Sequence, residues 1–191
     1  MACLRRQTVI REHRIDTPLG CLELLAGPQG LRAVRFPGER PAARRGAGAV
    51  GDAGPGPVDP AACLLEAARQ LSEYFAGERT VFELPLDPVG TPFQRAAWEV
   101  LRTIPFGRTI SYGEQAARLG SPKAARAVGA ANGRNPLPIV VPCHRVVGTG
   151  ARLGGYAGAE DGASDRVKRA LQCAEARAAR LPCPPHRSPR A

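Results

Sequence analysis

Apolar and polar side chains alternate along three short stretches near the start of the chain. They cover residues 7–15, 21–25 and 31–36, and a Gly-Pro-Gln-Gly turn at 27–30 separates the last two. A period of two is typical of strands that bury one face. The sequence therefore predicts a small antiparallel sheet.

Residues 37–60 interrupt this pattern with a run rich in Gly, Pro and Ala. The run has too little large apolar surface to offset the entropy lost on ordering, so we interpret it as a flexible loop. Helical spacing follows over 61–76, and Gly77 is expected to end that helix. The apolar positions of the helix are Leu64, Leu65, Ala68, Leu71 and Phe75. With a further strand expected over 81–86, residues 1–89 are predicted to form an α/β domain.

Helix start signals dominate the second half of the chain. The pair Thr91-Pro92 predicts an N-cap and a first helical turn, and apolar residues continue at helical spacing towards Pro105. Ser111 and Glu114 have the spacing of a capping box, which predicts a second helix that Gly120 ends.

A third helix is predicted directly afterwards, with Ser121 as its cap, Pro122 as its first residue and Gly133 as its stop. Two short helices joined by a tight turn predict a helix-turn-helix. Such a pair is a common means of placing a helix in a DNA groove, but many helix pairs of this kind bind nothing, so both interpretations stay open. We place it in a second domain over 90–180, followed by a disordered tail over 181–191.

Small side chains surround Arg126 on the third predicted helix. Such a surface lets the backbone approach a partner closely while one long cation projects from it. That combination fits a protein that binds and deforms the DNA minor groove better than one that reads the major groove. A helix that packs inside the protein has the same Ala-rich composition, so this alternative stays open.

Basic residues are concentrated in the middle of the chain. Residues 1–89 carry 11 basic and 11 acidic side chains, whereas residues 90–158 carry 9 and 2, and residues 159–191 carry 7 and 4. A near-neutral half beside a basic one suggests contact with a polyanion, since neutralised phosphates release counterions. A surface that is basic without binding a partner fits the same distribution.

An apolar run over 137–142, bracketed by prolines, leads directly into Cys143-His144-Arg145. The run is of strand type. A thiol is nucleophilic only as the thiolate, which a neighbouring imidazole and positive surroundings favour. Because adjacent residues of a strand face opposite sides, Cys143 and His144 can cooperate only if the strand has ended or a water bridges them. An inert buried cysteine is equally compatible with this dipeptide alone.

Membrane and secreted classes are excluded by the same sequence. No apolar stretch approaches the roughly 18–20 residues of a membrane-spanning helix, and residues 1–14 lack the apolar core of a secretory signal. We therefore expect a cytoplasmic protein with no membrane contact. The six cysteines include no CxxC pair, so free thiols and no metal site are expected in that reducing compartment.

Taken together, four motifs resemble the O6-alkylguanine-DNA alkyltransferases, also called methylated-DNA–protein-cysteine methyltransferases. The resemblance extends from about Thr91 to Glu175, with a looser similarity in TPLGCLEL at 17–24. The motifs are ISYGE at 110–114, PKAARAVGAANGRNP at 122–136, PCHRV at 142–146 and GGYAG at 154–158.

The resemblance implies both a fold and an activity. The expected fold is a ribonuclease-H-like α/β domain followed by a mostly helical, winged-helix-like domain. The expected activity is direct-reversal DNA repair, in which an alkyl group moves irreversibly from guanine O6 to the protein's own cysteine in a single turnover, with O4-alkylthymine as an open second substrate. The expected partner is double-stranded DNA, bound through its minor groove with the damaged base flipped out. A monomer without cofactor is expected.

The resemblance also assigns catalytic roles to five residues. Cys143 would accept the alkyl group, and His144 would act through a water as its base. Glu175 would orient the imidazole. Tyr112 would donate a proton towards the departing guanine and crowd the phosphate, and Lys168 matches a family lysine near the pocket.

Further residues are assigned by the same motifs to DNA and to the flipped base. Arg126 would fill the gap that the flipped nucleotide leaves in the stack. The other DNA-binding positions are Lys123, Ala125, Ala127 and Gly129. Asn135 would tie the recognition helix to the active-site strand, and backbone groups at Val146, Tyr156 and Ala157 would hold the base.

Departures from the family pattern leave some points open. The link over 159–167 is longer than usual, so Glu175 is assigned through its kept spacing from Lys168. Ala157 stands where some relatives have Ser, and the ligands that hold zinc in some relatives are missing. Two other function classes remain: a lesion-binding sensor that lacks the acceptor cysteine, and an unrelated Cys-His hydrolase that turns over repeatedly.

Overall fold

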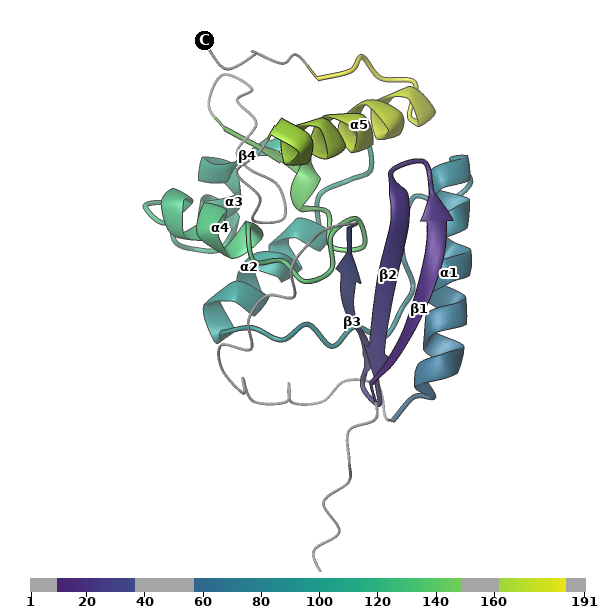
Figure 1. Ribbon diagram of the computed structural model, residues 1–191. Helices are drawn as coiled ribbons and strands as arrows, with labels where there is room; N and C mark the ends of the chain where they lie inside the picture. Colours follow the sequence, from purple (N-terminus) through teal and green to yellow (C-terminus); the bar gives the residue numbers. More distant parts are fainter. Residues whose placement is uncertain (1–9, 37–56, 149–161, 185–191) are drawn as a thin grey trace, which may run out of the picture. The chain divides into compact units, whose positions relative to one another are not determined.

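The computed structural model describes residues 10–36, 57–148 and 162–184 (Figure 1). The chain divides into two compact units, residues 1–89 and residues 90–191, and each is described separately here. The predicted flexible loop, apart from residues 57–60, lies outside the described residues, and so does most of the predicted tail.

The first unit contains the predicted antiparallel sheet, which is confirmed. Strands β1 (Arg11–Thr17), β2 (Gly20–Gly27) and β3 (Gly30–Arg35) pair in the order β1-β2-β3. Alternate residues of β2 are fully buried, because every second side chain points to the same face of a strand. The buried core positions of the sheet are Leu22, Leu24, Ala26, Leu31 and Val34.

Helix α1 (Pro60–Ala76) packs against all three strands. Asp59 caps its first turn by accepting a hydrogen bond from the amide of Ala61 at 3.0 Å. Gly77 ends it in the left-handed conformation at φ 78°, as the sequence predicts. Leu65 was expected on the apolar face but is 63% exposed, because its neighbour Leu64 already occupies the buried side.

The strand predicted over 81–86 is wrong. Only a single parallel bridge joins Leu86 to Leu31, with hydrogen bonds from the Leu31 amide to the Pro85 carbonyl and from the Asp87 amide to the Leu31 carbonyl, both 2.8 Å long. A proline within the run cannot donate to a strand ladder. The side chain of Gln70 instead holds this segment by exchanging two hydrogen bonds with the main chain of Glu83.

The second unit is mainly helical. Its helices are α2 (Pro92–Arg102), α3 (Tyr112–Arg118), α4 (Ala125–Asn132) and α5 (Gly162–Ala178). Strands β4 (Ile110–Ser111) and β5 (Val146–Val147) are each two residues long and pair in parallel. No helix among the described residues is long and apolar enough to span a membrane.

The helix caps agree with the sequence only in part. Thr91 and Gln94 form a full capping box on α2. On α3, Ser111 accepts the Glu114 amide at 3.0 Å, but the Glu114 carboxylate pairs with Arg118 instead of returning to the cap.

The predicted start of the third helix is wrong. Helix α4 begins at Ala125, and its N-cap, Ala124, provides no side-chain hydrogen bond. Ser121 and Pro122 lie in a preceding turn, which the 2.8 Å hydrogen bond from the Ala124 amide to the Ser121 carbonyl closes.

Buried hydrogen bonds connect the helices of the second unit. Gln115 of α3 and Asn132 of α4 exchange two side-chain hydrogen bonds, 3.1 and 2.7 Å long. Gln115 also donates to the carbonyl of Ala97, and Trp98 donates to the carbonyl of Ala131 at 2.9 Å. Because each of these groups would be costly to bury alone, the bonds fix how α2, α3 and α4 pack.

The cysteines differ from the expectation of free thiols. Cys173 and Cys183 form a disulfide with their Cα atoms 5.0 Å apart. Among the described cysteines, Cys21, Cys63 and Cys143 form no disulfide. The prediction rested on an expected reducing compartment and on the absence of a CxxC pair, whereas α5 and the segment after it bring these two cysteines together.

Candidate active site

The apolar run over 137–142 is a buried turn rather than the predicted strand. Prolines within it remove backbone donors that a ladder would need. The amide of Val141 bonds back to the carbonyl of Leu137 at 2.8 Å, and Ile139 has a positive φ of 75°. A β-branched residue in that conformation is held there by its surroundings, so this turn is tightly defined.

Cys143 begins a single 3₁₀ turn that ends at Arg145. The thiol is buried, with 4% of the residue exposed. Strand β5 follows the turn directly and pairs with β4, which directly precedes Tyr112. This short pairing therefore brings the cysteine turn to the start of α3.

Asn135 spans the turn that leads to the cysteine. Its side-chain amide donates to the carbonyl of Val141 at 2.7 Å and to Sγ of Cys143 at 3.2 Å. Its oxygen accepts the amide of Leu137 at 3.0 Å. The expected tie to an active-site strand is therefore corrected to a tie across a turn. A donor at the sulfur stabilises the thiolate.

His144 and Glu175 form a buried pair. Nε2 of His144 lies 2.8 Å from Oε1 of Glu175, and the two residues are 0% and 2% exposed. Burial lowers the pKa of His144, and the positive charges of Arg145 and Lys168 lower it further against the pull of Glu175. The imidazole is therefore neutral at physiological pH.

Arg145 completes this cluster from the other side of the carboxylate. Its Nε donates to Oε2 of Glu175 at 2.9 Å and its Nη2 to Oε1 at 2.8 Å. Burial would raise the pKa of Glu175, but the imidazolium that His144 becomes in acid, the charge of Arg145 and the hydrogen bonds of both residues outweigh it and hold that pKa well below its ordinary value. Glu175 is therefore ionised.

Lys168 of α5 lies against Tyr112, the first residue of α3. The ammonium Nζ of Lys168 lies 3.5 Å from the Tyr112 hydroxyl oxygen and 5.7 Å from the ring centroid. Burial, with the negative charges of Cys143 and Asp165, raises the pKa of Tyr112 to about 12. Burial lowers the pKa of Lys168, against the same two charges. Tyr112 therefore keeps its proton at neutral pH.

The predicted DNA-binding residues lie on or just before α4. Arg126, Lys123 and Ala127 are exposed, whereas Ala125 and Gly129 are half-buried. A Cβ added to Gly129 would lie 3.7 Å from the ring of Tyr112. The helix backbone is therefore close to the phenol that the sequence places in the active site.

The residues predicted to hold the base are described only in part. Val146 is fully buried beside the cysteine turn, while Tyr156 and Ala157 lie outside the described residues. Within the described ranges, no group of three or more potential metal ligands is present.

Three residues of this site were missed by sequence reasoning. The sequence analysis named Arg145 only as part of a motif. A charged residue close behind an apolar run is a signal that could have indicated a buried ion pair. Gln172 donates to the His144 carbonyl at 2.5 Å, and the amide of Gly107 donates to Oε2 of Glu175 at 3.0 Å. Gly107 has φ 73°, and a Cβ there would lie 2.8 Å from that of Ala179, so a glycine is required.

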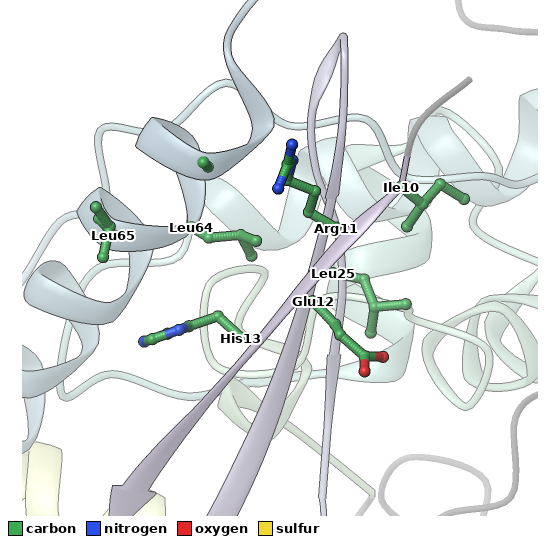
Figure 2. A pocket seen from close by; sticks show the side chains of 8 residues that line it. Ile10, Arg11, Glu12, His13, Leu25, Leu64 and Leu65 are labelled. Carbon is green, nitrogen blue, oxygen red and sulfur yellow. The ribbon is translucent and has the colours of Figure 1, made fainter. Parts of the chain in front are cut away.

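A separate hollow of about 550 Å³ lies in the first unit, between β1 and α1 (Figure 2). Its lining combines aliphatic side chains with the polar side chains of the first three residues of β1, and it contains no cysteine. The lining residues are Ile10, Arg11, Glu12, His13, Leu25, Ala61, Leu64 and Leu65. It belongs to the unit that does not contain Cys143, so we do not place the chemistry there.

Family comparisons cover both units. Residues 10–88 match the 6-O-methylguanine DNA methyltransferase ribonuclease-like domain, and residues 92–177 match the DNA binding domain of the same family. The two matches together span most of the chain.

Individual relatives agree with this assignment. The chain is 43% identical over 146 residues to a methylated-DNA–protein-cysteine methyltransferase of Methanosarcina acetivorans, covering 76% of this chain and 88% of that protein. It is 60% identical over 97 residues to the constitutive enzyme of that name from Bacillus subtilis, covering 51% of this chain and 59% of the relative.

Solved structures give the same result. The O6-methylguanine methyltransferase of Mycobacterium tuberculosis superposes with a TM-score of 0.71 at 38% identity, covering 92% of this chain and 97% of that one. A structure of the mycobacterial protein in complex with DNA superposes with a TM-score of 0.70 at 41% identity, covering 90% and 94%.

Proposed function

The chain belongs to the 6-O-methylguanine DNA methyltransferase family, and on that premise we propose that it repairs DNA by moving an alkyl group from guanine O6 to Cys143. The observation that carries the proposal is a buried cysteine beside the His144–Glu175 pair, within the segment that matches the family's DNA binding domain. The thioether is not reversed, so each chain acts once.

Cys143 is the proposed nucleophile. Its sulfur attacks the alkyl carbon in line with the C–O6 bond, so that a C–S bond forms as the C–O bond breaks. The thiol proton passes to His144, through a water, and Glu175 stabilises the imidazolium that results. Asn135 donates to the sulfur and favours its charged form.

Tyr112 is the proposed donor to the leaving group. The electron pair of the broken bond passes to the guanine, which takes up one proton as it leaves. Tyr112 keeps its proton at neutral pH, and Lys168 approaches the hydroxyl oxygen. With a cation at its oxygen, the phenol can direct its own O–H towards the base and stabilise developing negative charge.

DNA binding is assigned to α3 and α4, which we interpret as a helix-turn-helix that meets the minor groove. The exposed Arg126 enters the stack in place of the flipped nucleotide, which compensates part of an unstacking cost of a few kcal/mol. Small residues at Ala125, Ala127 and Gly129 allow close approach to the backbone, and Lys123 is placed to contact phosphate. The protein acts as a monomer in this proposal.

The flipped base is held mainly by backbone groups in this proposal. Val146 lies beside the cysteine turn, and Tyr156 and Ala157 are assigned the same role from their motif. Because Ala157 has no hydroxyl, only its amide can contact O6.

The decisive experiment uses a duplex oligonucleotide with one radiolabelled methyl group on guanine O6. We expect one label per chain, recovered on the peptide that contains Cys143. Cys143→Ala is expected to lose transfer completely and to keep DNA binding, while Cys21→Ala, at an exposed free cysteine, transfers normally.

Other outcomes identify the alternatives. Binding without any transfer by the wild-type protein would indicate a lesion sensor. More than one label released per chain would indicate a hydrolase. Transfer retained by Cys143→Ala would refute the assignment of the acceptor.

A further inference from the structure

Arg145 is a buried residue that is held at several points besides its contacts with Glu175. Besides its bonds to Glu175, its Nη1 donates to the carbonyl of Ile104 at 2.7 Å, and its guanidinium carbon lies 5.6 Å from the ring centroid of Phe106. The residue is 6% exposed. A buried guanidinium fixed at this many points has one orientation, and that orientation faces the carboxylate.

Glu175 accepts hydrogen bonds from two further groups besides His144. Arg145 donates through one nitrogen to each carboxylate oxygen, and the amide of Gly107 also donates to Oε2. An anionic carboxylate can only accept hydrogen bonds, so the contact with His144 has the imidazole as donor. At rest, Nε2 of His144 therefore carries the hydrogen and Nδ1 carries the lone pair that can take a proton.

The same guanidinium sets the charge balance at His144. Glu175 alone would favour the imidazolium, and Arg145 offsets that attraction. From α5, Lys168 adds a second positive charge, with Tyr112 and Asp165 acting on that lysine.

Helix α2 also packs against the cysteine turn. Its charged residues are the half-buried Arg95 and the exposed pair Glu99 and Arg102, which bond to each other. Arg145 thus brings a positive charge into direct contact with the Glu175 carboxylate, to which His144 is hydrogen-bonded.

We propose that Arg145 is a positioning residue for alkyl transfer: it holds Glu175 as the anionic acceptor of the His144 Nε2–H bond and keeps the imidazole neutral until the Cys143 thiol releases its proton. This inference rests on the proposed function for its kinetic consequence. Its structural part, the tautomer of His144, holds for the free protein without DNA.

The first test is therefore nitrogen NMR of the free wild-type protein with labelled histidine. The chain has three histidines, and the spectrum of His144→Gln identifies the signal of interest. We expect the neutral Nε2–H tautomer at neutral pH and above, because burial and the charges of Arg145 and Lys168 lower the pKa of His144. An Nδ1–H tautomer, or an imidazolium at neutral pH and above, would overturn the proposal whatever the protein does to DNA.

The second test compares two variants by the pH dependence of single-turnover transfer. Arg145→Gln removes the charge, so the pKa of His144 rises and the acid limb of the profile moves up by about one pH unit or more. The rate at pH 7 is expected to fall at least tenfold. Arg145→Lys keeps the charge but loses the two-point contact, and it is expected to restore the position of the limb while the rate stays reduced.

Arg69→Gln is the matched control. It removes an exposed guanidinium that pairs with Glu66 and Glu73 in the first unit, and both its rate and its profile are expected to equal those of the wild type. Folding of each variant is checked by thermal unfolding. A folded Arg145→Gln protein whose acid limb stays in place would overturn the positioning role. Failure of the wild type to transfer would instead refute the proposed function and leave the NMR result to decide the tautomer.

Discussion

At the scale of single residues, the side-chain amide of Asn135 donates to the reactive sulfur of Cys143 at 3.2 Å. A hydrogen bond to a charged group contributes about 1.5–3 kcal/mol. Asn135→Asp keeps an oxygen for the Leu137 amide but replaces the donor with a negative charge. We therefore expect methyl transfer to slow by roughly 10- to 100-fold, the factor that such an energy represents.

Alkylation of Cys143 by a small haloacetamide, followed by peptide mass spectrometry, measures the same effect without DNA. The variant is expected to react more slowly than the wild type at neutral pH, and its melting temperature shows whether the turn still folds. Equal reactivity in a folded variant would mean that the Asn135 amide does not act on the sulfur.

The sequence anticipated the types of residue in the site better than their connections. Cys143, His144 and Glu175 were all named from motifs, and the structure brings the last two into contact. The contacts of Glu175 with Arg145 and Gly107 were not foreseen, because these residues lie 30 and 68 positions away in sequence. No local pattern reports a contact made by folding of distant segments.

At the scale of elements, the disulfide joins the end of α5 to the segment that follows the helix. It links residues ten positions apart, and in between the Leu181 amide bonds to the Ala176 carbonyl at 2.7 Å. Leu181 and Ala179 also lie over Gly107, whose amide donates to Glu175. A cross-link of this kind restricts the unfolded chain and typically adds about 2–3 kcal/mol for a short loop.

We therefore expect reduction by a dithiol to lower the free energy of unfolding by about that amount. The double variant Cys173→Ser with Cys183→Ser should show the lower value under all conditions, and Cys21→Ser should equal the wild type. Denaturant unfolding with and without reductant measures the difference. Identical curves for the double variant and the oxidised wild type would contradict a stabilising cross-link.

Element prediction succeeded where a local signal decides the structure. The sheet strands and the Gly77 stop of α1 follow from alternation and from a glycine that tolerates positive φ. It failed over 81–86 and 137–142, where apolar runs containing prolines resemble strands. Apart from the bridge between Leu86 and Leu31, neither segment pairs with a strand among the described residues. The burial of residues 137–142 comes from tertiary packing, which periodicity cannot report.

At the scale of the whole molecule, charge is distributed unevenly between the two halves. Residues 1–89 are neutral overall and residues 90–158 carry a net charge of +7. Because phosphate contacts release counterions, binding through the second unit must weaken steeply with salt. We expect duplex affinity to fall on the order of 10²-fold between about 50 and 200 mM salt.

Single substitutions of exposed cations test which surface of the protein causes this salt dependence. Lys123→Ala removes one exposed cation just before α4, so the slope of log affinity against log salt is expected to decrease by about one, equally for damaged and undamaged duplexes. Arg69→Ala removes an exposed cation from the neutral half and should leave the slope unchanged. Fluorescence anisotropy with a labelled duplex measures all three proteins. If Arg69→Ala changes the slope as much as Lys123→Ala does, the basic segment is not the DNA-binding surface, and the proposed approach of α4 to the minor groove fails with it.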